Sequence, residues 1–156
     1  MPIHTEITEL SEIYASGRIL ALDPGLKRIG VAISDHDQII ATPLELIERR
    51  SWKHLLSCIK SLIITYDAKA LVIGLPLGFE GEETEMSILA REWQRKFSLS
   101  LSIPVFLEDE RVSSYEAMKR LWISGKSPKE ASKLVDSESA VVILETFLQR
   151  LREQAE

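Results

Sequence analysis

One short run of the sequence restricts the possible folds more than any other feature. Residues 70–74 are continuously apolar, which is typical of a parallel strand buried on both faces of its sheet. Such a strand needs a layer of helices on each side. Apolar side chains recur at helical spacing from Trp52 to Tyr66, with Ser51 as a suitable N-cap, and again from Met86 to Phe97. We therefore expect a three-layer α/β fold.

Other apolar segments predict the remaining strands. The segments 18–22, 29–34 and 39–47 are separated by turn residues and indicate an antiparallel meander. A further strand is expected at Val105 to Leu107, after Pro104.

The end of the sequence predicts helices. Ser113 with Glu116, and Ser127 with Glu130, have the spacing of a capping box, so helices should begin near 114 and 128. An amphipathic terminal helix is indicated by the apolar positions Ala140, Leu144, Phe147, Leu148 and Leu151. Three strands, a helix, a strand, a helix, a strand and terminal helices form the element order of an RNase H-like fold, a mixed five-stranded sheet with helices on both faces. A generic three-layer α/β domain would give much the same order.

Length and composition indicate one domain in the cytoplasm. The 156 residues suffice for a single core, which we place at 18–156, with residues 1–17 as an N-terminal extension of unassigned function. No apolar run approaches the ~20 residues of a membrane span. Cys58 is the only cysteine, which excludes an internal disulfide, and acidic residues stand where a signal peptide would be basic.

Three candidate catalytic carboxylates lie at the ends of predicted elements. Asp23 ends the first strand, Glu110 follows Glu108 and Asp109 at the end of the last strand, and Asp136 begins the terminal helix. Each also has a structural reading: Asp23 as part of a turn, the three successive acids as solvated residues at a helix N-terminus, and Asp136 as an N-cap. Asp136 precedes Ala140 by four residues and so should face the sheet.

The three carboxylates together are stronger evidence for a site than any one alone, because parallel-sheet proteins form their ligand sites at the ends of strands. If they converge, they form an oxygen-rich site suited to Mg²⁺ or Mn²⁺. A pair of such ions can activate water and stabilise the leaving oxygen of a phosphodiester.

Four segments in order resemble the motifs of the YqgF family of Holliday-junction-resolvase-like proteins. The segments are 23–32, 72–77, 109–114 and 135–140. The resemblance implies an RNase H-like nuclease that trims the 5′ end of the 16S ribosomal RNA precursor. It also implies Asp23, Glu110 and Asp136 as catalytic residues and metal ligands, and leaves the part of Asp109 open. Where the family usually has an Asn and an Asp-Gly turn, this chain has Gly-Phe-Glu-Gly-Glu-Glu at 78–83.

The charge pattern is compatible with a nucleic-acid partner despite a net charge of -5. Basic residues gather between 111 and 133, and acidic ones in the segment 80–85, which we expect at the edge of the site. The residues expected to contact phosphates are Lys27, Arg28, Arg111 and Lys133. The expected partner is structured RNA, the ribosomal RNA precursor, or branched DNA.

Other functions remain open from the sequence. Sugar-kinase and actin-like ATPases share the fold resemblance, but they use two related domains and a second Asp-x-Gly element, which this chain lacks. A DNA junction resolvase and a non-catalytic RNA-binding or regulatory protein are further alternatives. The complete set of three acids argues against the non-catalytic protein.

Overall fold

The computed structural model describes residues 16–110 and 128–155, with side chains in the second range from residue 138 to 154. Five strands follow the order β3-β2-β1-β5-β6, and a short β4 pairs with β2. Strand β1 is antiparallel to β2 and parallel to β5, which is parallel to β6. The elements are β1 (Arg18–Asp23), β2 (Arg28–Ser34), β3 (Ala41–Pro43), β4 (Ile47–Glu48), α2 (Trp52–Tyr66), β5 (Ala68–Leu75), α3 (Glu85–Ser100), β6 (Val105–Asp109) and α5 (Pro128–Ala155).

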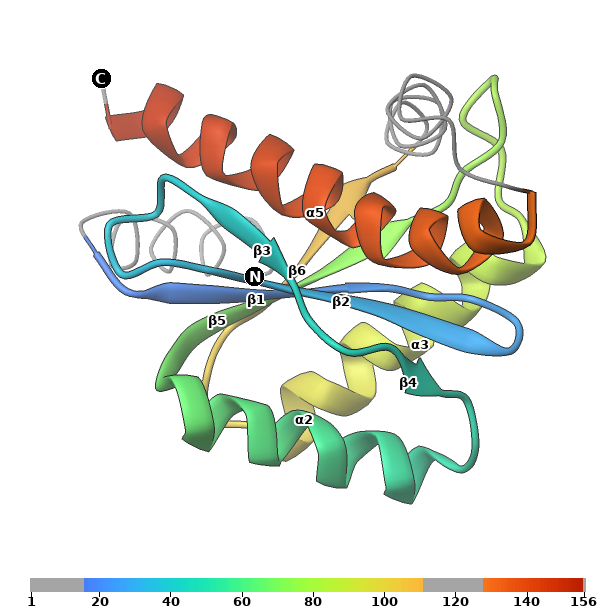
Figure 1. The fold of residues 1–156 in the computed structure, drawn as a ribbon, viewed down its shortest axis with the longest axis horizontal. Coiled ribbons are helices and arrows are strands. Elements are labelled where there is room, and N and C mark those ends of the chain that lie inside the picture. The colour runs from blue at the N-terminus through green and yellow to red at the C-terminus, as the bar shows by residue number, and fades with distance from the viewer. Residues whose placement is uncertain (1–15, 111–127, 156) are drawn as a thin grey trace.

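The sheet is the middle of three layers. Helix α5 crosses one face, while α2 and α3 cover the other (Figure 1). Strand β1 supplies both cores: Leu20 and Leu22 pack on the side of α2 and α3, and Ile19 and Ala21 on the side of α5. The expected three-layer α/β fold with helices on both faces is confirmed.

Helix α2 has the bounds expected from the sequence. Ser51 Oγ accepts a hydrogen bond from the backbone N–H of His54 (3.1 Å), which caps the first turn. The helix ends at Asp67, whose left-handed backbone (φ 52°) lets its N–H donate to the Ile63 carbonyl.

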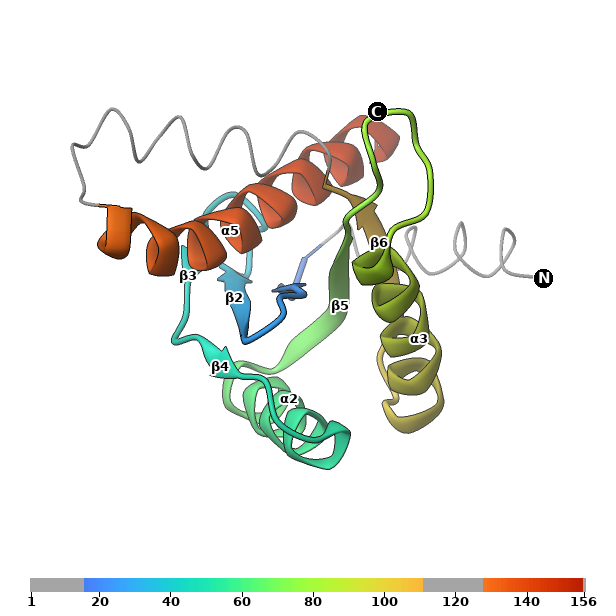
Figure 2. The same ribbon diagram turned by 90° about the vertical axis from the view of Figure 1, so that its right-hand side faces the viewer.

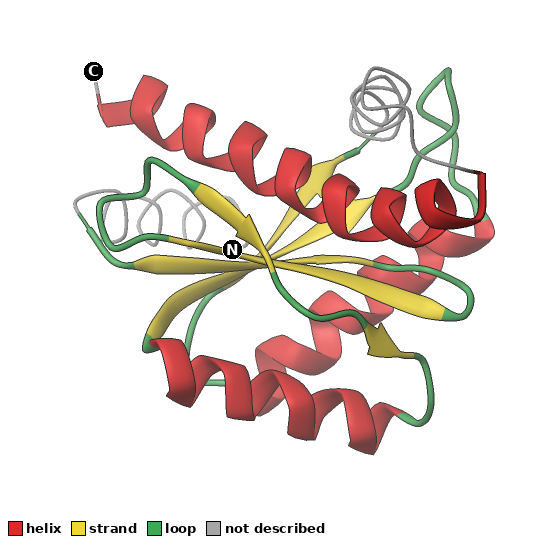
Figure 3. Ribbon diagram, viewed as in Figure 1, coloured by secondary structure: helices red, strands yellow, loops and turns green. Residues whose placement is uncertain are grey.

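The prediction of a single strand over residues 39–47 is wrong. Two short strands, β3 and β4, pair with different parts of β2, and a loop separates them (Figure 3). Asp35 Oδ1 accepts hydrogen bonds from the backbone N–H groups of Ile39 (2.7 Å) and Ile40 (2.9 Å), which holds both in a turn. Pro43 has no N–H to donate to a ladder and ends β3.

A second difference concerns the C-terminal helices. Helix α5 is already helical at Pro128, where the described residues resume, and it runs without interruption through 28 residues (Figure 2). Asp136 therefore lies inside a helix, and its interpretation as an N-cap is wrong, because a cap residue has non-helical backbone angles. The helix expected near 114 falls outside the described residues.

The described part of the chain contains no helix long and apolar enough to cross a membrane.

The aromatic contact between α2 and α3 predicts where stability is concentrated. Phe97 is fully buried, and its ring lies 4.6 Å from that of Trp52 between centroids. Phe97→Ala should lower the free energy of unfolding by about 3–5 kcal/mol, because the cavity cannot close completely. Urea unfolding would measure this, with Ile64→Ala as the control. Ile64 is 81% exposed, so equal losses in both variants would contradict the assignment of Phe97 to the core.

Candidate functional site

Strand β1 is buried in its middle and ends in a carboxylate. Residues 19–22 of β1 are fully buried, and Asp23 follows them half-buried at the strand end. The next turn is tight: a Cβ added to Gly25 would collide with the carbonyl oxygen of Arg28. The interpretation of Asp-Pro-Gly as a turn is thus correct as local structure, and Asp23 itself stands at the end of the strand.

Glu110 reaches the same edge from β6. Its backbone N–H donates to the Leu75 carbonyl (3.1 Å), which extends the pairing of β5 and β6 by one step. The side chain is only 7% exposed and forms a hydrogen bond with the Asp23 side chain. Two of the three predicted carboxylates are therefore in contact.

The absence of a side chain at Gly74 makes room for Glu110. A Cβ there would collide with Glu110 Oε2 and with Ile143 Cδ1 of α5, so β5, β6 and α5 meet at this point. Glu110 Oε2 is buried without a hydrogen-bond partner. An acceptor oxygen in this state is a ready ligand for a cation.

Electrostatics favour a proton or a cation at this carboxyl group. Burial raises the pKa of Glu110, and the negative charge of Asp109 raises it further, while the hydrogen bond with Asp23 acts in the opposite direction. Two carboxylates ~4 Å apart repel by roughly 4 kcal/mol at an effective dielectric constant of 20. An ionised pair therefore needs positive charge beside it.

The three successive acids at 108–110 have separate environments. Glu108 and Glu110 are both buried, and Glu108 Oε1 lies 3.3 Å from Arg150 Nε in an ion pair that ties α5 to β6. Side chains alternate along a strand, so Asp109 projects to the opposite face and influences Glu110 through its charge. Their interpretation as three solvated acids is wrong.

Asp136 can be placed by its backbone. It precedes Ile143 by seven residues, two helical turns or roughly 10 Å along α5. Ser139, which lies between them, is buried, and its Oγ has no hydrogen-bond partner. The Asp136 side chain lies outside the described residues, so its convergence with Asp23 and Glu110 stays a prediction. Among the described residues no group of three His, Cys, Asp or Glu side chains could hold a metal.

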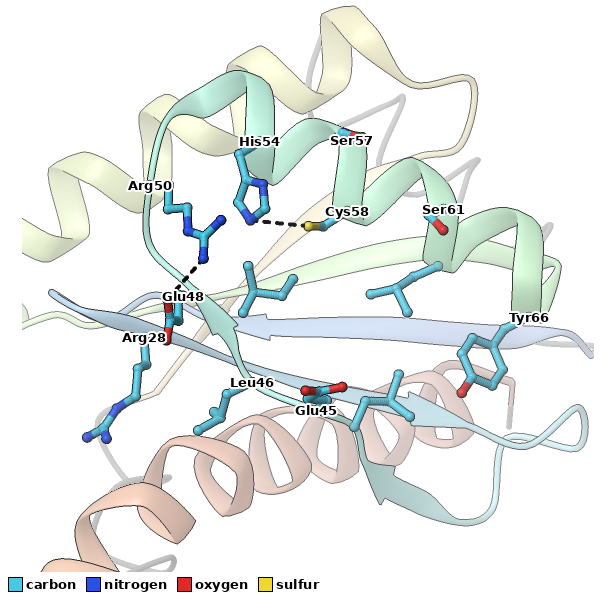
Figure 4. Close-up of a pocket in the computed structure, with 13 residues that line it drawn as sticks. Arg28, Glu45, Leu46, Glu48, Arg50, His54, Ser57, Cys58, Ser61 and Tyr66 are labelled. Carbon is cyan, nitrogen blue, oxygen red and sulfur yellow. Dashed lines mark hydrogen bonds and ion pairs between the residues drawn. The ribbon is translucent and has the colours of Figure 1, made fainter.

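Of the four residues predicted to contact phosphates, the structure describes the side chains of two. Lys27 is exposed in the turn after Asp23, and Arg28 is half-buried at the start of β2. Arg28 also borders an open hollow of about 1050 Å³ between β4 and α2, with its side chain pointing away from α2 (Figure 4). Neither Asp23 nor Glu110 lines that hollow. Arg111 lies outside the described residues, as does the side chain of Lys133.

The sequence reading missed Arg49. Its backbone N–H donates to the Lys27 carbonyl (2.8 Å), and its Nη1 approaches the Gly25 carbonyl (3.4 Å), two residues from Asp23. The guanidinium also lies over the Trp93 ring, 6.0 Å from its centroid. The adjacent pair Arg49-Arg50 before the N-cap was a signal that could have found it.

Loop 76–84 joins β5 to α3 beside this edge of the sheet (Figures 1 and 2). Most of the acidic segment 80–85 lies on it, as expected, although Glu85 is the first residue of α3.

Known proteins are similar to this chain over most of its length. The family described as RuvX, Holliday junction resolvase, matches residues 17–150. A protein of Maridesulfovibrio salexigens named "Putative pre-16S rRNA nuclease" is 37% identical over 133 residues, which are 85% of this chain and 98% of that protein. A protein of the same name from Koribacter versatilis is 39% identical over 134 residues, 86% of this chain and 88% of that protein.

Solved structures support the fold. RuvC of T. thermophilus in complex with a Holliday junction superposes with a TM-score of 0.52 at 13% identity, over 85% of this chain and 95% of that one. At this identity the likeness shows the fold alone, and it confirms the expected RNase H-like arrangement.

The raised pKa of Glu110 predicts how stability depends on pH. A carboxyl group whose pKa is higher in the folded protein stabilises fully below the unfolded value of 4.5, and loses that effect as pH rises through the folded value. Without divalent cations, Glu110→Gln should be more stable than wild type at about pH 7–8, and the difference should vanish toward about pH 4. Urea unfolding in EDTA would measure it.

The control is Glu153→Gln, at an exposed position on α5. A Glu110→Gln protein that is less stable than wild type at neutral pH would contradict the raised pKa of Glu110.

Proposed function

The chain belongs to the RuvX family of Holliday junction resolvases, and from this premise we propose that it is a metal-dependent nuclease that matures the 5′ end of the 16S ribosomal RNA precursor. The observation that carries the proposal is the buried contact between Asp23 and Glu110, with Glu110 Oε2 left without a hydrogen-bond partner. The choice of RNA follows the names of relatives at 37–39% identity. Such a substrate places the protein in the cytoplasm.

The residues fit a divalent cation. Asp23 and Glu110 offer carboxylate oxygens at one point, and Gly74 keeps that point open. Mg²⁺ and Mn²⁺ prefer such oxygen ligands, and when bound they supply an activated water and stabilise the leaving oxygen. Asp136 is the proposed third ligand.

The basic residues near the site are proposed to bind the phosphates of the substrate. Lys27 and Arg28 come four and five residues after Asp23, and the backbone of Arg49 is hydrogen-bonded to the same turn. We assign Lys27, Arg28, Arg111 and Lys133 to the phosphates that flank the scissile bond. These contacts orient the backbone so that the phosphodiester faces the carboxylates, and they carry no base specificity.

Cleavage of branched DNA is the second candidate, because the family is described as a Holliday junction resolvase. Labelled 16S precursor RNA and a DNA four-way junction, each with Mg²⁺, Mn²⁺ or EDTA, would separate the two. Metal-dependent cleavage of the RNA is expected. Cleavage of the junction alone would replace this proposal by the second candidate, and binding without cleavage by wild type would indicate a non-catalytic RNA-binding protein.

Asp23→Asn tests the catalytic assignment. The amide keeps the size of the side chain but removes a charge, so cleavage should fall by about 10²–10³-fold or more while RNA affinity is retained. Folding should survive, since repulsion with Glu110 is relieved. Single-turnover cleavage and filter binding would measure both quantities. Asp37→Asn, in an exposed turn, is the matched control, and wild-type cleavage by Asp23→Asn would refute the mechanism.

Lys27→Ala tests the phosphate contacts. Removing one contact should weaken RNA binding for all sequences and reduce the slope of log affinity against log salt by about 1. Lys60→Ala, on the exposed surface of α2, should leave the slope unchanged. A wild-type affinity that is the same at low and physiological salt would contradict phosphate binding altogether.

A further inference from the structure

An aromatic side chain stands in solvent beside the proposed site. Phe79 is 96% exposed, at the tip of loop 76–84, which follows β5 beyond Gly74 and Leu75. Exposed apolar residues are common singly. This one is more exposed than any other large hydrophobic side chain of the described residues, and it comes five residues after Gly74, which makes room for Glu110.

Backbone hydrogen bonds hold the loop that carries Phe79. The Gly78 N–H donates to the Glu82 carbonyl (2.9 Å), and the Gly81 N–H donates back to the Gly78 carbonyl (2.9 Å). Gly81 has a positive φ of 84°, which closes the turn. Glu82 Oε2 accepts from the Glu80 N–H (3.0 Å). The backbone at Phe79 is therefore held in a closed turn, so that a partner would need to order little of the loop.

The far end of the loop is fixed to the helix and to the strand end. Thr84 Oγ1 donates to the Pro76 carbonyl (2.6 Å) and accepts the Ser87 N–H (3.0 Å) in a capping box. Glu83 forms two hydrogen bonds with Arg91 (2.8 and 2.9 Å). The loop position is thus set by β5 and α3, the same frame that positions Gly74.

The charge of the loop defines what Phe79 can bind. Residues 76–84 contain three glutamates and no lysine or arginine, so the loop cannot attract a phosphate. The side of a nucleotide that fits an aromatic ring beside acidic groups is the base, whose π-face stacks without regard to sequence. Leu75 and Phe79 are four residues apart, at most about 14 Å of chain, so that base would lie within a few nucleotides of the scissile phosphate.

We propose that Phe79 stacks on an unpaired base of the RNA strand next to the cleavage site, which makes a single-stranded segment part of the substrate. The inference rests on the proposed nuclease function. Bases within a duplex are already stacked on their neighbours, whereas the unpaired bases of RNA loops and ends can be splayed onto aromatic side chains. Phe79 therefore selects RNA that is unpaired at this position.

The test compares wild type, Phe79→Ala and Phe79→Trp, with Ile64→Ala as an exposed apolar control on α2. Each binds, in EDTA, a single-stranded RNA that carries 2-aminopurine and a duplex of the same sequence. Phe79→Ala should lose roughly 5- to 150-fold of its affinity for the single strand, together with the change in 2-aminopurine fluorescence. Phe79→Trp should retain both. Duplex affinity and the salt dependence should stay at wild-type values, because no phosphate contact is removed.

The outcomes separate this proposal from the nuclease assignment. If Phe79→Ala keeps wild-type affinity for the single strand while Asp23→Asn abolishes cutting, the stacking proposal fails and the nuclease stands. If Phe79→Ala loses single-strand binding but wild type cuts no RNA, stacking is supported and the nuclease fails. Equal losses on single strand and duplex would also overturn stacking, since a damaged fold would produce them.

Discussion

Burial of β1 on both faces is the constraint on which the structure depends. Its alternating side chains enter two separate cores, one under α5 and one above α2 and α3. Each core would lose its centre without β1, so the position and register of β1 are strongly determined. Asp23 comes directly after the last fully buried residue. The chain thus attaches a proposed catalytic group to a strand that is packed on both faces, where a small displacement of the carboxylate would be costly.

The contact of Asp23 with Glu110 lowers the stability of the fold and favours the binding of a cation. Burying Glu110 next to another carboxylate costs free energy, and the fold contains compensating interactions nearby. The ion pair of Glu108 with Arg150 anchors α5 two residues earlier on β6, and Gly74 opens the space in which the carboxyl group lies. Such an arrangement is expected where a site must bind a cation, because a site already satisfied by internal hydrogen bonds would bind one weakly.

The sequence predicted the features that are determined locally. Ser51 gave the start of α2, because a cap residue acts within a few positions. The sequence did not predict features that depend on contacts between residues far apart in the chain. The separation of β3 from β4 depends on Asp35 holding Ile39 and Ile40, and Arg49 reaches the Asp23 turn only through the pairing of β4 with β2. The contact of Asp23 and Glu110 was predictable because both lie at the ends of parallel strands, β1 and β6, which flank β5, and the burial of Glu108 was not.

The net charge of -5 constrains how such a protein can recognise a polyanion. Long-range attraction cannot supply most of the affinity, since much of the surface repels phosphates. Under the proposed function, binding would rely on the phosphate contacts assigned to Lys27 and Arg28 and on interactions that do not depend on charge. Base stacking is such an interaction, and at Phe79 it is available where the acidic loop excludes the backbone. An acidic loop that repels phosphates and an exposed ring that attracts bases would together orient a strand with its bases toward α3 and its phosphates toward Asp23.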